Sequence, residues 1–332
     1  MFNKLLIGTA ALSLAATMAM GAVGVTFNVA SGDKEEVFND MVNNKIESIG
    51  FVLSDPHERI NDAYQSKYGT PKIDGKPNEA YDKQYEEYLD NLGFFSIAND
   101  EKLRELLIKA PELGGFSPFN LHIYKVKGED KTYVGHVNPE TMLDIVGVTD
   151  KDVRTKFVAM FPPLDALVDK EIGGVKKNVE YDKLTAKPMM EFEYEFERPK
   201  DLADFIDEFQ GEFEAAFEDN KYIIAGYKNF KEAYNDMGED FSKYDAYWVY
   251  SLCHFTFSYS IFNKGRPDAG VFAPCSMYMY IEKGSNKLMI GMPKLENWIA
   301  VMGIKDPKKV DAIHTLDKEI ISIMEDLGAK SK

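Results

Sequence analysis

The sequence is short of the residues that assemble recognisable catalytic sites. It has only two cysteines, Cys253 and Cys275, which stand 22 positions apart and form no Cys-x-x-Cys pair. The usual redox and metal motifs of cysteine are therefore absent. No Gly-x-Ser-x-Gly segment marks a nucleophile elbow, and no glycine-rich loop followed by a lysine marks a phosphate site. These absences favour a protein that is not an enzyme.

Positive charge is scarce as well. Lysine and arginine number 39 against 55 aspartates and glutamates, and the formal net charge is −16. A polyanion such as DNA or RNA would be repelled by such a chain, so we expect no nucleic-acid partner. The acidity serves solubility, and it would also suit a basic or cationic partner. The 332 residues are 45% apolar, which is enough for sizeable cores, and the length favours two domains.

Long apolar runs are missing except near the N-terminus. An uncharged run extends from Leu5 to Ala30, and Ala19 and Gly21 offer small residues at the positions that a signal peptidase reads. Residues 1–30 are therefore predicted to be a secretory signal peptide, with the mature protein beginning near Ala22. The run of 26 residues is also long enough to stay in a membrane as an anchor. Either alternative predicts an exported protein, soluble or anchored in a bacterial periplasm.

The chain contains an internal repeat. When the sequence is shifted by 156 residues, Pro111–Pro118 falls on Pro267–Pro274, with two prolines, a glycine and a phenylalanine identical. Identities continue without a gap as far as Asp150 on Asp306, at more positions than average composition predicts. Many of them are glycine or proline, which mark special backbone geometry. We interpret the repeat as a duplication.

The second copy is the easier one to trace. Apolar and acidic residues alternate over Met189–Glu197, the period of a half-buried strand. Phenylalanines on one face of 199–217 predict an amphipathic helix. Further strands are expected at 222–227, 247–254, 271–281 and 287–292, and closing helices at 295–302 and 307–327. The first copy fits the same order of a strand, a helix, four strands and helices less cleanly.

These elements set the expected domain boundaries. The first α+β repeat spans residues 36–173, and the second spans residues 189–328 and carries both cysteines. Residues 174–188 are polar and follow a Gly-Gly pair, so we expect a linker there.

The segment Pro267–Cys275 resembles the domain of unknown function 302 family. Members carry a similar Pro-x-x-Gly, then Pro-Cys, then a strand, and a cysteine tends to lie upstream, where Cys253 stands here. The resemblance covers most of residues 186–328 and, more weakly, 36–173. It implies an α+β fold with a curved antiparallel sheet backed by helices, similar to the TATA-box-binding-protein-like topology, and it implies no activity. The first copy departs from the pattern, because Phe119 stands where the cysteine belongs.

The two cysteines are the candidate site. At the 156-residue offset they correspond to Ile97 and Phe119, so both are replaced by apolar residues. That joint replacement suggests a pair of sulfurs side by side in a largely buried place. A disulfide between neighbouring strands is one interpretation, since an oxidising compartment favours it and its loop closure would stabilise the fold by about 3 kcal/mol. Two unrelated buried thiols, which behave as small apolar side chains, are another.

A redox-active or soft-metal site is the third interpretation. Cys275, Met277 and Met279 alternate along one strand and therefore share a face. Thiolate and thioether ligands suit Cu(I). His254 adjoins Cys253 and could add an imidazole. The identity of any cofactor is left open by the sequence.

Two functions follow from these observations. The first is an exported, non-catalytic binding or accessory protein, whose ligand and protein partner the sequence leaves unidentified. Cys253, Cys275 and His254, together with the aromatic side chains of Tyr280 and Trp298, are the candidate pocket residues. The second is a thiol-based redox or soft-metal protein acting through Cys275 and Cys253.

Overall fold

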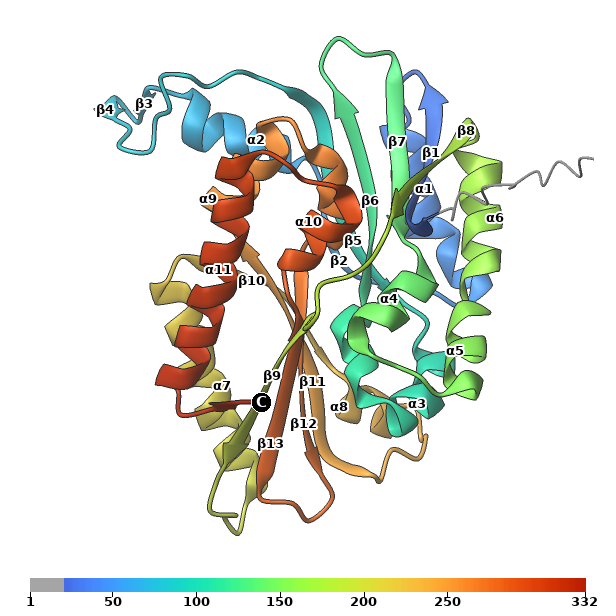
Figure 1. Ribbon diagram of the computed structural model, residues 1–332, viewed down its shortest axis with the longest axis vertical. Helices are drawn as coiled ribbons and strands as arrows, with labels where there is room; N and C mark the ends of the chain where they lie inside the picture. The colour runs from blue at the N-terminus through green and yellow to red at the C-terminus, as the bar shows by residue number, and fades with distance from the viewer. Residues whose placement is uncertain (1–20) are drawn as a thin grey trace, which may run out of the picture.

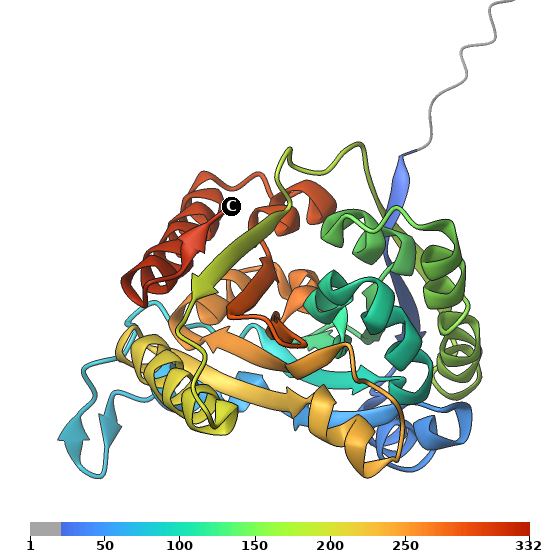
Figure 2. The same cartoon turned by 90° about the horizontal axis from the view of Figure 1, so that it is seen from below.

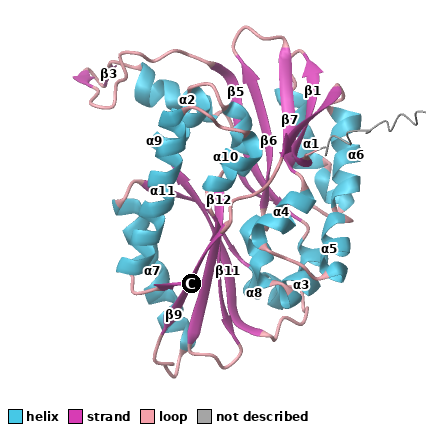
Figure 3. Cartoon of the chain, viewed as in Figure 1, coloured by secondary structure: helices cyan, strands magenta, loops and turns pink. Residues whose placement is uncertain are grey.

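The computed structural model describes residues 21–332. The chain has an α+β architecture, in which two six-stranded antiparallel sheets are backed by helices (Figure 1). Figure 2 shows most of the long helices at the periphery, with the strands between them. A separate two-stranded hairpin, β3–β4, projects from one end (Figure 3). No helix in residues 21–332 has both the length and the apolar character needed to cross a membrane.

We call residues 22–181 the first half of the molecule. Its elements are β1 (Ala22–Ser31), α1 (Glu35–Asn44), η1 (Ile46–Ile49), β2 (Val52–His57), α2 (Ile60–Tyr64), η2 (Gln65–Gly69), β3 (Lys72–Ile73), β4 (Lys76–Pro77), β5 (Leu89–Ala98), α3 (Asp100–Lys109), η3 (Pro111–Phe116), β6 (Phe119–Val126), β7 (Lys131–Val137), α4 (Pro139–Val146), α5 (Lys151–Val158), α6 (Phe161–Glu171) and β8 (Val175–Tyr181).

Residues 189–331 form the second half. Its elements are β9 (Met189–Glu195), α7 (Leu202–Asp219), β10 (Tyr222–Asn229), α8 (Phe230–Asp236), β11 (Tyr244–His254), α9 (Phe255–Ser258), η4 (Tyr259–Asn263), η5 (Pro267–Phe272), β12 (Cys275–Glu282), β13 (Lys287–Pro293), α10 (Glu296–Met302), α11 (Pro307–Asp326) and β14 (Lys330–Ser331).

The two sheets have the same strand order. The first runs β2-β5-β6-β7-β1-β8, and the second runs β10-β11-β12-β13-β9-β14. Three elements of the first half, η3, β6 and β7, begin 156 residues before η5, β12 and β13. In each half, the first strand (β1 or β9) lies between β7 and β8 in the first sheet and between β13 and β14 in the second. The two halves therefore follow the same path.

Helix α7 illustrates how the sequence builds these elements. Asp201 caps its N-terminus by accepting a hydrogen bond from the Ala203 backbone N–H. Phe209, Phe213 and Phe217 recur every four residues and are buried against the second sheet. The helix predicted at 199–217 is confirmed as α7, because both its N-terminal cap and the spacing of its phenylalanines are those of an α-helix.

Each half places its short η segment on the sheet of the other half. Asn120 on β6 donates a hydrogen bond from Nδ2 to the carbonyl oxygen of Gly270 in η5, over 2.6 Å. The hydroxyl of Ser276, on β12, donates to the carbonyl oxygen of Pro118, which follows η3, over 3.2 Å. Both Pro118 and Pro274 follow cis peptide bonds. We call these two reciprocal packings the crossing contacts.

The N-terminal boundary differs from the prediction. Residues 22–31 form β1, which pairs with β7 on one side and β8 on the other, and Val25 and Phe27 are buried in it. A membrane anchor over the whole run to Ala30 is therefore wrong, and the first half begins before residue 36. Of the leader predicted over residues 1–30, residues 1–20 lie outside the described residues, and export stays a prediction.

Two internal boundaries also differ. The predicted linker 174–188 contains β8, which pairs with β1, so the connection shortens to residues 182–188. The strand predicted at 271–281 begins at Cys275, because Val271 and Phe272 belong to η5 and are buried there. A last strand, β14, adds a sixth strand to the second sheet.

Candidate functional site

The two cysteines lie on neighbouring strands but form no disulfide. Cys275 on β12 pairs with Leu252 on β11, the residue next to Cys253. Successive side chains of a strand point to opposite faces, so the register places the two thiols on opposite faces of the sheet. Both are free. The predicted disulfide is therefore wrong.

The thiols are poorly suited to redox chemistry. Both residues are half-buried, and burial raises the pKa of Cys253 to about 11 and that of Cys275 further still. The thiolate is the nucleophilic form of cysteine, and it is scarce at such pKa values. The cavity beside both residues measures about 20 Å³, which is room for a single water molecule.

The soft-metal interpretation finds little support in the geometry. Met277 and Met279 share the face of Cys275, and both are fully buried in the core of the second half. Within residues 21–332, no group of three or more histidine, cysteine, aspartate or glutamate side chains converges as a metal site would need. The burial of Met277 and Met279 suits a role in the core, and a soft-metal site that uses their sulfurs stays a prediction.

The other predicted site residues fall in two places. Trp298 and His254 line the small cavity beside the cysteines, and His254 accepts a hydrogen bond at Nδ1 from the Phe257 backbone N–H, capping α9. Tyr280 lies further along β12, where its ring stacks on Tyr247 at 5.9 Å between centroids. The structure thus brings Trp298 and His254 to the cysteines and leaves Tyr280 away from them.

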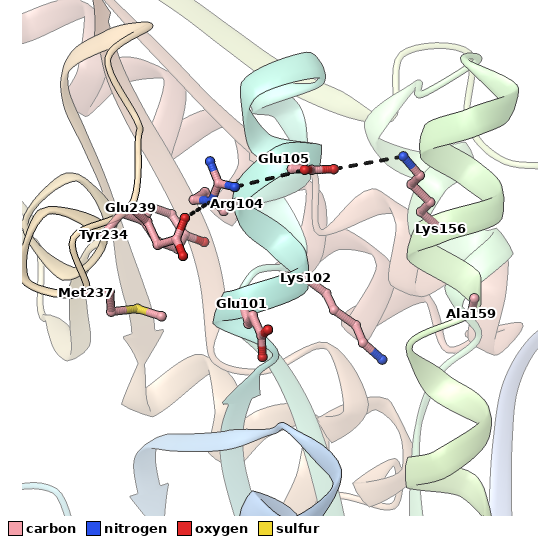
Figure 4. A pocket seen from close by; sticks show the side chains of 9 residues that line it. All are labelled: Glu101, Lys102, Arg104, Glu105, Lys156, Ala159, Tyr234, Met237 and Glu239. Atoms are coloured by element: carbon pink, nitrogen blue, oxygen red, sulfur yellow. Dashed lines mark ion pairs between the residues drawn. The ribbon is translucent and has the colours of Figure 1, made fainter.

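A larger groove lies where the two halves meet (Figure 4). Helices α3 and α5 of the first half form two of its walls, and α8 with the turn after it forms the third. Its volume is about 450 Å³, within the range of small-molecule sites. Ala159, Tyr234 and Met237 supply its less polar surface. The charged side chains lining this interhalf groove are Glu101, Lys102, Arg104, Glu105, Lys156 and Glu239.

Arg104 contacts two of the acidic side chains of the interhalf groove. Its Nε lies 3.2 Å from a carboxylate oxygen of Glu239, and its Nη1 donates to the carbonyl oxygen of Asp240 over 2.8 Å. Glu105 lies 4.0 Å from both Arg104 Nη2 and Lys156 Nζ. Three acidic and three basic side chains therefore share one cavity, in which ion pairs link Arg104 to Glu239 and Glu105, and Glu105 to Lys156 (Figure 4).

Sequence reasoning missed this groove. The charges of α3 stand at positions 101, 102, 104 and 105, a pattern typical of any solvated helix face. The third wall comes from α8, more than 120 residues later in the chain. No local sequence pattern therefore predicts the groove. Tyr234 offers the nearest clue, because this buried residue of α8 donates its hydroxyl hydrogen to the carbonyl oxygen of Asp100 on α3.

Comparison with known proteins yields a partial likeness to a solved structure. No family model matches the chain, and no curated protein matches it. A solved structure similar to part of it is the crystal structure of an uncharacterized conserved protein, DUF302, from Bacillus stearothermophilus. The two are 18% identical, the match covers 42% of this chain and 98% of that chain, and the TM-score is 0.35.

Proposed function

We propose that this chain is an exported, non-catalytic binding protein whose ligand enters the interhalf groove. The observation that carries the proposal is the groove itself, a cavity of about 450 Å³ with three acidic and three basic side chains at the junction of the halves. A pocket with convergent polar groups is the usual place for a small ligand.

The charges of the groove favour an amphoteric ligand. Arg104 Nη2, which lies 4.0 Å from Glu105, offers N–H donors for a ligand carboxylate, and Lys156 adds a second cation. Glu101 and Glu239 could accept an ammonium group. A free amino acid or a dipeptide carries both groups and fits the volume.

A binding screen with a matched pair of variants tests this proposal. Calorimetric titration with amino acids and a set of dipeptides should detect a ligand of the unmodified protein. Arg104→Ala should weaken that binding by about tenfold, the effect of losing a charge-assisted hydrogen bond. Arg198→Ala is the control, because Arg198 also pairs with one carboxylate, that of Asp245, and one backbone carbonyl, at a site away from the groove.

Two results would refute the proposal. One is the absence of binding for every amphoteric compound in the screen. The other is equal weakening by the two arginine substitutions, since this would mean that the loss comes from a general change in charge.

We also propose that the two halves are copies of one domain related to the domain of unknown function 302 family. The shared strand order and the matching positions of η3 and η5 support a duplication. The family relation rests on the Pro-x-x-Gly and Pro-Cys pattern of Pro267–Cys275. Export rests on the apolar residues before Ala22, and a mature N-terminus near Ala22, found by N-terminal sequencing, would support it.

A further inference from the structure

A second groove, separate from the first, lies between α2 and β10. Its volume is about 730 Å³ and its surface is mainly apolar. Residues from both halves line it, and they come from α2, η2 and the β3–β4 hairpin on one side and from β10 and α9 on the other. We call it the lysine-flanked groove, lined by Lys67, Ile73, Lys221, Tyr222, Ile223 and Phe255 among others.

Apolar side chains are exposed in this groove. Ile73 is 49% exposed and Ile223 is 48% exposed, whereas most large apolar residues of the chain are buried. The hairpin that carries Ile73 is held in place, because the Asn78 side chain donates hydrogen bonds to the carbonyl oxygens of Lys67 and Thr70 over 2.7 and 2.8 Å. Exposed apolar surface on a fixed scaffold is typical of a binding site.

The lysines of the groove lie next to its apolar surface. Lys67 Nζ lies 5.0 Å from the ring centroid of Phe255. Burial lowers the pKa of His254, the carboxylate of Glu319 opposes this shift, and the ammonium groups of Lys221 and Lys67 add to it. Both cations therefore lie near His254. Lys72 and Lys76 flank Ile73 on the hairpin and extend the positive charge.

The two charged residues that line the groove, Lys67 and Lys221, are both cations, and no carboxylate of the described residues lines it. Lys228, further along β10, pairs with Asp100 at 2.6 Å. Within residues 21–332, Lys67, Lys72, Lys76 and Lys221 form no such pair. A chain with a net charge of −16 thus gathers unpaired cations around an apolar surface. An anionic amphiphile complements this combination, because its chain covers the apolar side chains while its head group meets the lysines.

We propose that the lysine-flanked groove binds a single-chain anionic amphiphile, a long-chain fatty acid carboxylate. The alkyl chain lies along Ile73, Ile223 and Phe255, and the carboxylate meets Lys67 and Lys221. This site is distinct from the interhalf groove, so its test is independent of any amphoteric ligand.

Calorimetric titration with laurate below its micelle concentration tests the proposal on the full chain. The unmodified protein should bind laurate at one site. Lys67→Gln combined with Lys221→Gln should weaken binding by about tenfold, since two charge-assisted contacts are lost. Ile73→Glu should weaken it by at least about fivefold by placing a charge beneath the alkyl chain.

The matched control lies on the edge strand β8. Lys177 Nζ lies 5.8 Å from the ring of Tyr133, and Val175 beside it is 74% exposed. Lys177→Gln combined with Lys183→Gln, just after β8, removes the same charge from two exposed lysines and should leave laurate affinity within about twofold. Circular dichroism and thermal unfolding of every variant should match the unmodified protein, because all the changed side chains are exposed.

Three outcomes would overturn the proposal. The first is no laurate binding by the unmodified protein. The second is equal affinity for dodecyl maltoside, which has the same alkyl chain without the charge. The third is binding to phosphatidylglycerol vesicles without binding to monomeric laurate, which would assign the groove to a membrane surface.

Discussion

The two crossing contacts place equivalent segments on equivalent sheets with different side chains. On the first sheet, His122 Nε2 lies 2.8 Å from the carbonyl oxygen of Pro267, and its Nδ1 lies 2.9 Å from that of Gly93. On the second sheet, the Tyr247 hydroxyl donates to the carbonyl oxygen of Pro111 over 2.5 Å. Pro111 and Pro267 correspond at the 156-residue offset, whereas His122 on β6 and Tyr247 on β11 do not.

This comparison shows which part of the contact both halves keep. A backbone carbonyl buried between two sheets needs a hydrogen-bond donor, because an unpaired one costs free energy. Either a phenol or an imidazole satisfies that need, from either of two adjacent strands. The backbone position is therefore shared, while the donor and its response to pH differ between the halves.

The largest expected effect on stability comes from adding a methyl group to a glycine at either crossing contact. A Cβ on Gly270 would lie 2.6 Å from the His122 ring and 2.8 Å from that of Phe94, and a Cβ on Gly114 would collide with Tyr247 and Tyr278. Gly270→Ala and Gly114→Ala should each lower the free energy of unfolding by about 3 kcal/mol through overpacking. Urea denaturation measures the change.

Gly211 supplies a control of opposite sign. It lies inside α7, and a Cβ added there would meet no atom of another element within 4 Å, so Gly211→Ala should raise the free energy of unfolding by about 1 kcal/mol. A similar loss for Gly211→Ala and Gly270→Ala would contradict the interpretation of the crossing contacts as tightly packed.

The next effect separates the two donors. His122→Phe should cost about 2 kcal/mol and Tyr247→Phe about 1 kcal/mol, because each loses one hydrogen bond to a buried carbonyl group and the phenyl ring is also larger than the imidazole that it replaces. Phenylalanine matches the ring volume of Tyr247 but exceeds that of His122, which is fully buried. Equal costs in urea denaturation would show that the site of His122 accommodates the larger ring without strain.

A pH series sharpens the same comparison. Burial lowers the pKa of His122 to about 4, below the value of about 6.5 in an unfolded chain. The unfolded state therefore binds the proton more readily, and the stability from neutral His122 is present above pH 6.5 and lost as the pH falls towards 4. The loss should reach about 3 kcal/mol.

Subtraction isolates this group from the carboxylates that titrate nearby. The difference in free energy of unfolding between the unmodified protein and His122→Phe should shrink and then change sign as the pH falls from 6.5 to below 4, because the loss of about 3 kcal/mol exceeds the cost of the substitution. The corresponding difference for Tyr247→Phe should stay constant, since burial raises the pKa of Tyr247 well above 10. A constant difference for both variants would mean that His122 does not titrate in this range.

The smallest expected effect concerns the cysteines, which stand where the first half has Ile97 and Phe119. At pH 8 the native thiols should not react with dithionitrobenzoate, because burial raises both pKa values. Both should react after unfolding in urea. Cys253→Val should change the free energy of unfolding by less than about 1.5 kcal/mol, as for other apolar exchanges of similar volume. Rapid reaction of either native thiol would favour the redox alternative.

Local sequence patterns predicted the elements that bury only one of their faces. The acidic and aromatic alternation of β9 and the phenylalanine period of α7 predicted both elements at nearly their observed bounds. Strand β1 was missed because it lies between two other strands, and a strand buried in this way has a nearly continuous apolar sequence. In Ala22–Ser31 that sequence continues the apolar run before it, so a leader and a strand look alike.

The candidate sites were harder to predict than the fold. The apolar residues at the positions of Cys253 and Cys275 in the first half correctly indicated buried surroundings. They did not indicate which face each thiol takes, because a shift of one residue in register reverses the face. The register Cys275 with Leu252 is a property of the paired strands and is not encoded near either cysteine.

By itself, the sequence determined the apolar and acidic periods, the turns at glycine and proline and the recurrence at 156 residues, because each is a local property of the chain. Only the tertiary structure decided where distant segments meet. It placed α8 against α3 to form the interhalf groove, and the β3–β4 hairpin beside β10 to form the lysine-flanked groove. The physical reason is that packing between two segments depends on the shape and the hydrogen-bonding groups of both surfaces. The sequence of one segment does not specify the surface of the other.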